Sequence, residues 1–249
     1  MMRKLLAIGS LALLAAACSA GAQSHQAQAS GQRANRTFEV GAFQSVALQG
    51  PHNVVVTVGG APSVRAEGDT AALDMLDIRV ENGRLVVGTR RGWSWRGPGG
   101  EVTVHVTAPA IQAAAIGGSG DMRIDRVQGD RFEASIGGSG DMEIGAVQAR
   151  EAEFSIAGSG GIRAAGQAEA ADISIAGSGD MVLNGLQTRR AHVSVMGSGN
   201  VSLAASEAVD GSIMGSGDLN VTGAARCSVT RMGSGSVNCA GGGGGQATE

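Results

Sequence analysis

Seven copies of the tripeptide Gly-Ser-Gly occur in the second half of the chain, and a serine in a glycine-rich loop could act as a nucleophile. These serines are Ser119, Ser139, Ser159, Ser178, Ser198, Ser216 and Ser234. Nucleophilic catalysis requires one serine with a base in reach and a third group that orients the base. Seven equivalent serines and four scattered histidines supply no such set, and the spacing of a nucleophile elbow is missing. The repeats therefore predict a protein that is not an enzyme.

The residue after the second glycine is usually acidic, and a row of acids could bind calcium. The residues at this position are Asp121, Asp141, Gly161, Asp180, Asn200, Asp218 and Ser236. Calcium-loaded β-rolls carry a related repeat, but with a period of about nine residues. Asp, Asn and Ser side chains also accept hydrogen bonds from backbone amides at tight turns, which accounts for Asn200 and Ser236 as well. We interpret this column as bracing for a corner and predict no metal site.

The segment from residue 89 to 100, TRRGWSWRGPGG, contains both tryptophans of the chain. Its candidate binding residues are Arg90, Arg91, Trp93, Trp95 and Arg96. Two aromatic rings on one side of an extended segment, with arginines nearby, could hold a glycan, an anionic polymer or a lipid surface through stacking and charge. A decorated hairpin loop, or tryptophans that cap the open end of a core, would explain the same residues.

The spacing of the serines indicates the elements that carry them. Successive serines are 20, 20, 19, 20, 18 and 18 residues apart, which is typical of stacked copies of one supersecondary unit. Apolar residues recur on alternate positions on both sides of each serine, so each repeat is a strand, a tight corner and a second strand. We predict an all-β fold with a right-handed parallel β-helix of about seven coils over residues 111–240. A β-sandwich of hairpins is the alternative.

Residues 36–110 carry further runs of alternating apolar and polar residues, and they predict an N-terminal β region that leads into the solenoid and caps it. Asn82-Gly83 between two of these runs is a hairpin signal. The chain has no tyrosine, four phenylalanines and two tryptophans. Stacked aliphatic side chains must therefore fill the core, which suits a narrow solenoid interior.

The N-terminus has the pattern of an export signal, because Arg3 and Lys4 precede an apolar run too short to span a bilayer. We expect a signal peptide at residues 1–17, lipidation at Cys18, a flexible tether at 18–35 and a glycine-rich tail at 241–249. Ordinary signal peptidase cleavage after Ala22 is the alternative to lipidation. The mature chain keeps 17 basic and 22 acidic side chains, and this net charge of −5 argues against nucleic acid as a partner.

Two cysteines remain once Cys18 is set aside. Cys227 and Cys239 both fall in columns that are apolar in the other repeats, so both thiols should face the interior of the last coil. An even pair in an exported protein predicts a disulfide, which would stabilise a loop of this size by about 3 kcal/mol. Metal binding by two cysteines without a histidine nearby is the weaker alternative.

Several stretches together resemble a known family. FQSVALQGPHNVVVTVG, ENGRLVV, VTVHVTAPAIQAAAIGGSGDM and the repeated GSGD or GSGN corners are similar to the head GIN domain of the autotransporter adhesins, from about Arg36 to Ala240. The resemblance implies a β-helical, non-enzymatic protein of the bacterial cell envelope with an adhesive role and no cofactor.

The expected function is accordingly that of an adhesin or a structural surface module, held at the outer membrane by its lipid anchor and facing the periplasm or the outside. Its partner would be a polysaccharide or another envelope protein. One rival is a periplasmic module that senses polysaccharide or envelope stress through the tryptophan segment. Another is an enzyme that acts on polysaccharide, which would need a cluster of acids and bases on one face.

Overall fold

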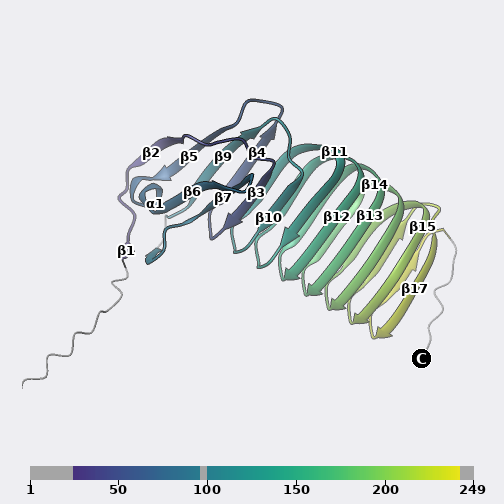
Figure 1. Ribbon diagram of the computed structural model, residues 1–249. Helices are drawn as coiled ribbons and strands as arrows, with labels where there is room; N and C mark the ends of the chain where they lie inside the picture. Colours follow the sequence, from purple (N-terminus) through teal and green to yellow (C-terminus); the bar gives the residue numbers. More distant parts are fainter. Residues whose placement is uncertain (1–24, 96–99, 242–249) are drawn as a thin grey trace, which may run out of the picture.

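The computed structural model describes residues 25–95 and 100–241 (Figure 1). The expected signal peptide at residues 1–17, Cys18, Arg96 and the tail beyond Gly241 lie outside the described residues. The described chain is mostly β and forms a solenoid of about six turns from residue 113 to 239, preceded by an N-terminal β region. The predicted fold class is therefore confirmed. The solenoid makes about six turns over residues 113–239, where the sequence predicted about seven coils.

Each coil of the solenoid consists of one long strand that bends round the core or of two shorter strands. The strands are β10 (Ala113–Ile116), β11 (Met122–Ile136), β12 (Met142–Gly158), β13 (Gly161–Gly177), β14 (Asp180–Gly197), β15 (Val201–Gly215), β16 (Leu219–Thr222), β17 (Arg226–Gly233) and β18 (Val237–Cys239). Each pairs in parallel with the next coil through residues at the same repeat position, such as Ile136 with Ile156. Hairpins would pair antiparallel, so the β-sandwich alternative is wrong here.

The apolar columns of the repeat point into a narrow core. Ile136, Ile156 and Ile175 follow one another in register and are at most 2% exposed. Phe132 and Phe154 are also buried, in neighbouring columns of adjacent coils. A buried side chain of this size stabilises the fold by roughly 1.5–3 kcal/mol relative to exposure. Because every coil repeats the arrangement, the core runs unbroken along the solenoid.

Strands β3 (Ser45–Gln49) and β4 (Asn53–Val58) form one more coil before the first Gly-Ser-Gly corner. β3 pairs in parallel with β10, and β4 pairs in parallel with β11. The corner between β3 and β4 contains Gly50, Pro51 and His52 instead of Gly-Ser-Gly. Asn53 then takes the place of the corner acid, and its Oδ1 accepts a hydrogen bond from the amide of Asp121 at 3.2 Å.

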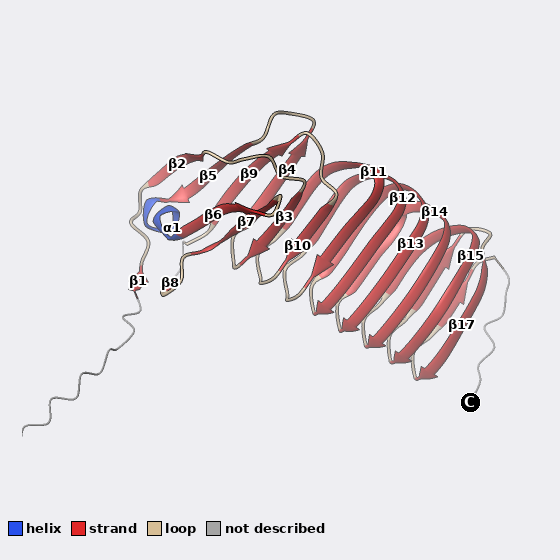
Figure 2. Cartoon of the chain, in the orientation of Figure 1, coloured by secondary structure: helices blue, strands red, loops and turns tan. Residues whose placement is uncertain are grey.

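The other N-terminal strands extend the two faces of the solenoid and finish its end (Figure 2). β7 (Arg84–Thr89) continues the face of β3 in parallel, and β9 (Val102–Ala108) continues that of β4. β2 (Arg33–Phe38), β5 (Ser63–Asp69) and β6 (Leu76–Glu81) add antiparallel pairs. Asn82 and Gly83 join β6 to β7 with φ of 51° and 74°, which confirms the predicted hairpin.

Two details differ from the sequence predictions. A helix, α1 (Thr70–Met75), lies within the region expected to be all-β, and it begins where Oδ1 of Asp69 accepts a hydrogen bond from the amide of Ala71 at 2.9 Å. In addition, β1 (His25–Ala27) and the start of β2 fall within the expected tether. β1 pairs with β8, β2 pairs with β5, and between them Oδ2 of Asp69 accepts hydrogen bonds from Gly31 N at 2.9 Å and Ser30 Oγ at 3.0 Å.

Candidate functional site

One outward surface of the solenoid carries two columns of charged side chains. It is formed by the second half of β11 to β15, where outward and inward residues alternate. We call this surface the charged face. Its residues are Arg131, Glu133, Glu151, Glu153, Asp172, Arg190, His192 and Asp210. Because the coils are in register, side chains from sequence positions about 20 residues apart become neighbours.

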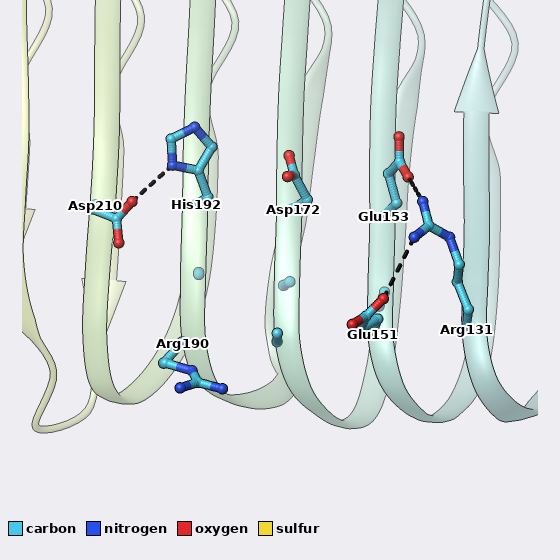
Figure 3. Close-up of a pocket in the computed structure, with 11 residues that line it drawn as sticks. Arg131, Glu151, Glu153, Asp172, Arg190, His192 and Asp210 are labelled. Atoms are coloured by element: carbon cyan, nitrogen blue, oxygen red, sulfur yellow. Dashed lines mark hydrogen bonds and ion pairs between the residues drawn. The ribbon is translucent and has the colours of Figure 1, made fainter.

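A hollow of about 280 Å³ lies in the middle of the charged face (Figure 3). Its cause is Ala170, which pairs with Glu151 in the preceding coil and with Arg190 in the following coil. A methyl group therefore stands where both neighbours have long side chains. Ala152, Ala171 and Ala191 also line the hollow, although their side chains lie in the adjoining inward column. The result is a hollow with a small-residue floor and a charged rim.

Ion pairs of Arg131 and a hydrogen bond of His192, each between neighbouring coils, flank the hollow (Figure 3). Arg131 contacts Glu153 at 2.6 Å and Glu151 at 3.5 Å. At the other side, Nδ1 of His192 lies 2.8 Å from Oδ2 of Asp210. Exposed pairs of this kind contribute only about 0–1 kcal/mol to stability. These charges therefore add little to the fold and remain accessible to a ligand.

Asp172 and Arg190 border the hollow between these pairs. Within residues 25–95 and 100–241, neither side chain forms an ion pair or a hydrogen bond. One carboxylate and one guanidinium are thus open to solvent on the same rim, and each can form a charge-assisted hydrogen bond with a bound molecule.

The seven predicted corner serines all lie on one exposed edge of the solenoid. Their backbone amides hold successive coils together: Ser139 N donates to Gly118 O at 3.0 Å, and Ser178 N donates to Gly158 O at 2.9 Å. The structure therefore places these serines in corners that join the coils, on a different part of the surface from the charged face.

The corner acids accept hydrogen bonds from the backbone of the next coil. Oδ1 of Asp121 accepts from Asp141 N at 2.9 Å, and Oδ1 of Asp141 accepts from Gly161 N at 2.8 Å. Gly161 has no side chain with which to continue this chain of contacts. A second run starts at Asp180 and passes through Asn200 and Asp218 to Ser236. The bracing is thus between coils. Asn200 serves in the same column because its Oδ1 also accepts from the next coil, whereas Ser236 ends the run as a donor to Asp218.

Asp218 shows the electrostatic effect of this bracing. The hydrogen bonds that Ser236 donates through its hydroxyl, at 2.7 Å, and through its amide, at 2.8 Å, lower the pKa of Asp218. Across the described part of the chain, no group of three or more His, Cys, Asp or Glu side chains is arranged to hold a metal ion. No described helix is long and apolar enough to cross a membrane.

The tryptophan segment lies at the N-terminal end, away from the charged face (Figure 2). β8 (Trp93–Trp95) pairs in parallel with β1, and the backbone amide of Trp93 donates to Arg90 O at 3.2 Å. Arg90 Nε donates to Leu76 O at 3.2 Å, so this arginine is directed towards the N-terminal strands. Arg91 is exposed, and Trp93 is partly buried. A binding role for this segment stays a prediction.

Cys227 on β17 and Cys239 on β18 are joined by a disulfide, with their Cα atoms 6.5 Å apart. Both are partly buried against the core, as their columns predicted. The bond connects β17 to β18, which stacks on β16 and is the last strand of the solenoid within the described residues. The disulfide therefore fastens the end of the stack.

The sequence analysis did not predict the charged face. Its residues are ordinary exposed charges when each strand is read alone, and they form a site only after the coils are aligned. The available signal was the column that contains Glu151, Ala170 and Arg190, in which one alanine interrupts charged residues. The corner serines lie on a different part of the surface from the charged face. The tryptophan segment also lies away from it.

Comparison with known proteins shows which family and which solved structures this chain is similar to. The family described as "Putative auto-transporter adhesin, head GIN domain" matches residues 42–225. A search of curated proteins gives no match. A solved structure described as a putative adhesin from Bacteroides fragilis is 18% identical with a TM-score of 0.76, and covers 85% of this chain and 99% of its own.

Two solved Parabacteroides structures have the same fold. A putative lipid binding protein from Parabacteroides distasonis is 23% identical with a TM-score of 0.71, covering 86% of this chain and 99% of its own. A putative adhesin from Parabacteroides merdae is 18% identical with a TM-score of 0.68, covering 86% and 98%. The similarity to these structures concerns the fold, whereas the family match spans most of the chain. The protein belongs to the head GIN domain family of putative auto-transporter adhesins.

Proposed function

We propose that this protein is a non-enzymatic adhesin of the cell envelope and that the charged face is its contact surface. Membership of the family implies an exported protein. The observation that carries the proposal is the hollow between Asp172 and Arg190, on a face whose charges contribute little to stability. Such a surface offers binding groups that the fold itself does not need.

The geometry favours an extended ligand. Coils are spaced by about 4.8 Å, so a polymer that lies along the solenoid axis meets the same columns at every step. Arg190 can bind a carboxylate of the polymer, and Asp172 can accept hydrogen bonds from hydroxyl or ammonium groups. Polysaccharides and extended segments of envelope proteins both present these groups in repeating order.

Several features of the face argue against polysaccharide cleavage. A glycosidase requires one carboxylic acid that stays protonated, which normally needs an apolar pocket. Glu151 and Asp210 are exposed and paired with Arg131 and His192. Exposed carboxylates beside basic groups, outside any apolar pocket, are suited to binding a ligand.

The place of the protein on the cell is tested by protease treatment of intact cells. We expect the protease to cleave this protein on intact cells if it is anchored through Cys18 at the outer membrane and faces outwards. A periplasmic marker protein should stay intact under the same treatment. If the protease does not cleave the protein until the outer membrane is opened, the protein is not a surface adhesin. The periplasmic binding module is then the function that remains. Metabolic labelling with a fatty acid tests the anchor, because labelling should disappear in Cys18→Ser.

The contact surface is tested by a charge reversal with a matched control. Arg190→Glu should reduce the attachment of cells to a polysaccharide-coated surface, or the binding of the purified protein to that polysaccharide. Arg163→Glu, in the first half of β13, changes the net charge equally at an exposed site outside the charged face. Equal loss in both variants would show a nonspecific charge effect and reject the charged face as the contact surface.

A further inference from the structure

Three exposed methionines lie in one column of the last coils. Met196, Met214 and Met232 are 49%, 45% and 63% exposed, and they are the exposed large hydrophobic side chains of the described residues. Met196 pairs in register with Met214, and Met214 pairs in register with Met232. We call these three residues the methionine column. In earlier coils the same column holds Ala157 and Ala176, so it is not part of the core.

The remaining methionines of the described chain have the opposite environment. Met75, Met122, Met142 and Met181 are at most 3% exposed and pack in the core. A methionine side chain in the core fills space between other apolar side chains, and this packing explains its presence there. The methionine column has no such explanation, because its side chains project from the solenoid beside one another.

We propose that the methionine column binds one soft monovalent cation, which in the cell is Cu(I). Thioether sulfur is a soft ligand that selects Cu(I) over harder metal ions. Side chains in neighbouring coils start about 4.8 Å apart, and methionine has three rotatable side-chain bonds. Three in-register thioethers can therefore converge on one ion above Met214, the middle residue.

The surroundings of the methionine column favour the same class of ion. The outward column two residues earlier holds Ser194, Ser212 and Thr230, which offer hydroxyl groups and no carboxylate. Calcium and magnesium require carboxylate or carbonyl oxygens in larger number. Arg231 occupies the inward column beside Met232 and donates Nη1 to Gly235 O at 2.7 Å, which directs its charge towards the corner.

The test uses the exported chain with Cys18→Ser in every sample, so that no free thiol competes. The methionine methyl groups are labelled with ¹³C, and silver nitrate in a chloride-free buffer supplies Ag(I) as a soft probe that does not change oxidation state. The signals of Met196, Met214 and Met232 should shift together and stop shifting at one equivalent. The four buried methionines serve as internal controls and should not shift.

Met214→Leu should weaken Ag(I) binding by about tenfold or more, because it removes the central ligand at an exposed position without disturbing the core. His192→Gln should leave the affinity unchanged. Equal affinity of Met214→Leu and the parent chain would overturn the proposal, as would three signals that respond with separate affinities. Anaerobic competition with a coloured Cu(I) chelator should give the same order of affinities, and failure to compete would reject copper as the ion.

Discussion

Alanine at Gly177 should destabilise the solenoid far more than alanine at Gly129. Gly177 lies in a corner with φ of 139°, and a Cβ placed there would overlap the carbonyl oxygen of Gly158 in the preceding coil. That oxygen accepts the hydrogen bond from Ser178 N at 2.9 Å. The two coils cannot separate to make room for a methyl group without weakening this bond.

The size of the effect follows from these two contributions. A residue other than glycine at such a φ costs about 1–3 kcal/mol. Loss of the inter-coil hydrogen bond adds about 1 kcal/mol. The free energy of unfolding should therefore fall by about 2–4 kcal/mol. With a denaturant dependence of about 3 kcal/mol per molar urea, the upper end of the usual range, the urea midpoint falls by about 1 M.

Gly129 provides the matched control. The nearest atom to a Cβ at Gly129 is the carbonyl oxygen of Arg131 at 3.9 Å, and the register partner in the next coil is Ala149. Gly129→Ala should leave the midpoint unchanged or raise it slightly, because alanine restricts the unfolded chain by about 0.4–1 kcal/mol. Urea titration followed by circular dichroism measures both variants. Equal midpoints for Gly177→Ala and Gly129→Ala would refute the stacking argument.

Three further predictions concern the interior and the end of the solenoid. Burial lowers the pKa of His52 from its ordinary value of 6.5, so the unfolded chain takes up the proton first and stability should fall as the pH drops below about 6.5. His52→Gln should flatten this dependence between pH 7 and 5; thermal unfolding of this variant and of the parent chain at each pH gives the comparison. Phe154→Ala should lower the free energy of unfolding, measured by urea titration, by about 3–5 kcal/mol, because the side chain is fully buried. Cys227→Ser should change electrophoretic mobility only without reductant, and should speed amide exchange in β17 and β18 through loss of the disulfide.

Each of these predictions has a result that would contradict it. An unchanged pH slope in His52→Gln would mean that another group causes the loss of stability. A cost below about 1 kcal/mol for Phe154→Ala would mean that neighbouring coils close the cavity without penalty. Identical mobility of Cys227→Ser and the parent chain without reductant would exclude the disulfide in the isolated protein.

The solenoid could be predicted because the sequence repeats its pattern. One alternation of apolar and polar residues is ambiguous, but the columns that contain Ile136 and Met142 recur at a fixed distance from each corner. Parallel stacking then follows, because equivalent residues must occupy equivalent places in every coil. The disulfide partners could be predicted for the same reason, since both cysteines fall in inward columns.

The remaining features depend on contacts that no repeat reveals. The coil formed by β3 and β4 has Pro51 and His52 in its corner, so it lacks the Gly-Ser-Gly signature although its backbone stacks in the same way. The helix α1 has only six residues, and it depends on the capping contact of Asp69 and on the burial of Ala72, Leu73 and Met75. The hollow depends on the single residue Ala170 standing between two charged neighbours from other coils.

The register between coils shifts only on the side of the solenoid away from the corners. The shifts lie between Ile144 and Val147, between Arg163 and Ala165, and in the stretch from Leu183 to Arg190. A residue can therefore be gained or lost there without moving the corner edge. In evolutionary terms, the corners act as a fixed spine while the opposite side accepts insertions and deletions. Duplication of one coil would lengthen the molecule by about 4.8 Å and keep all existing contacts in register.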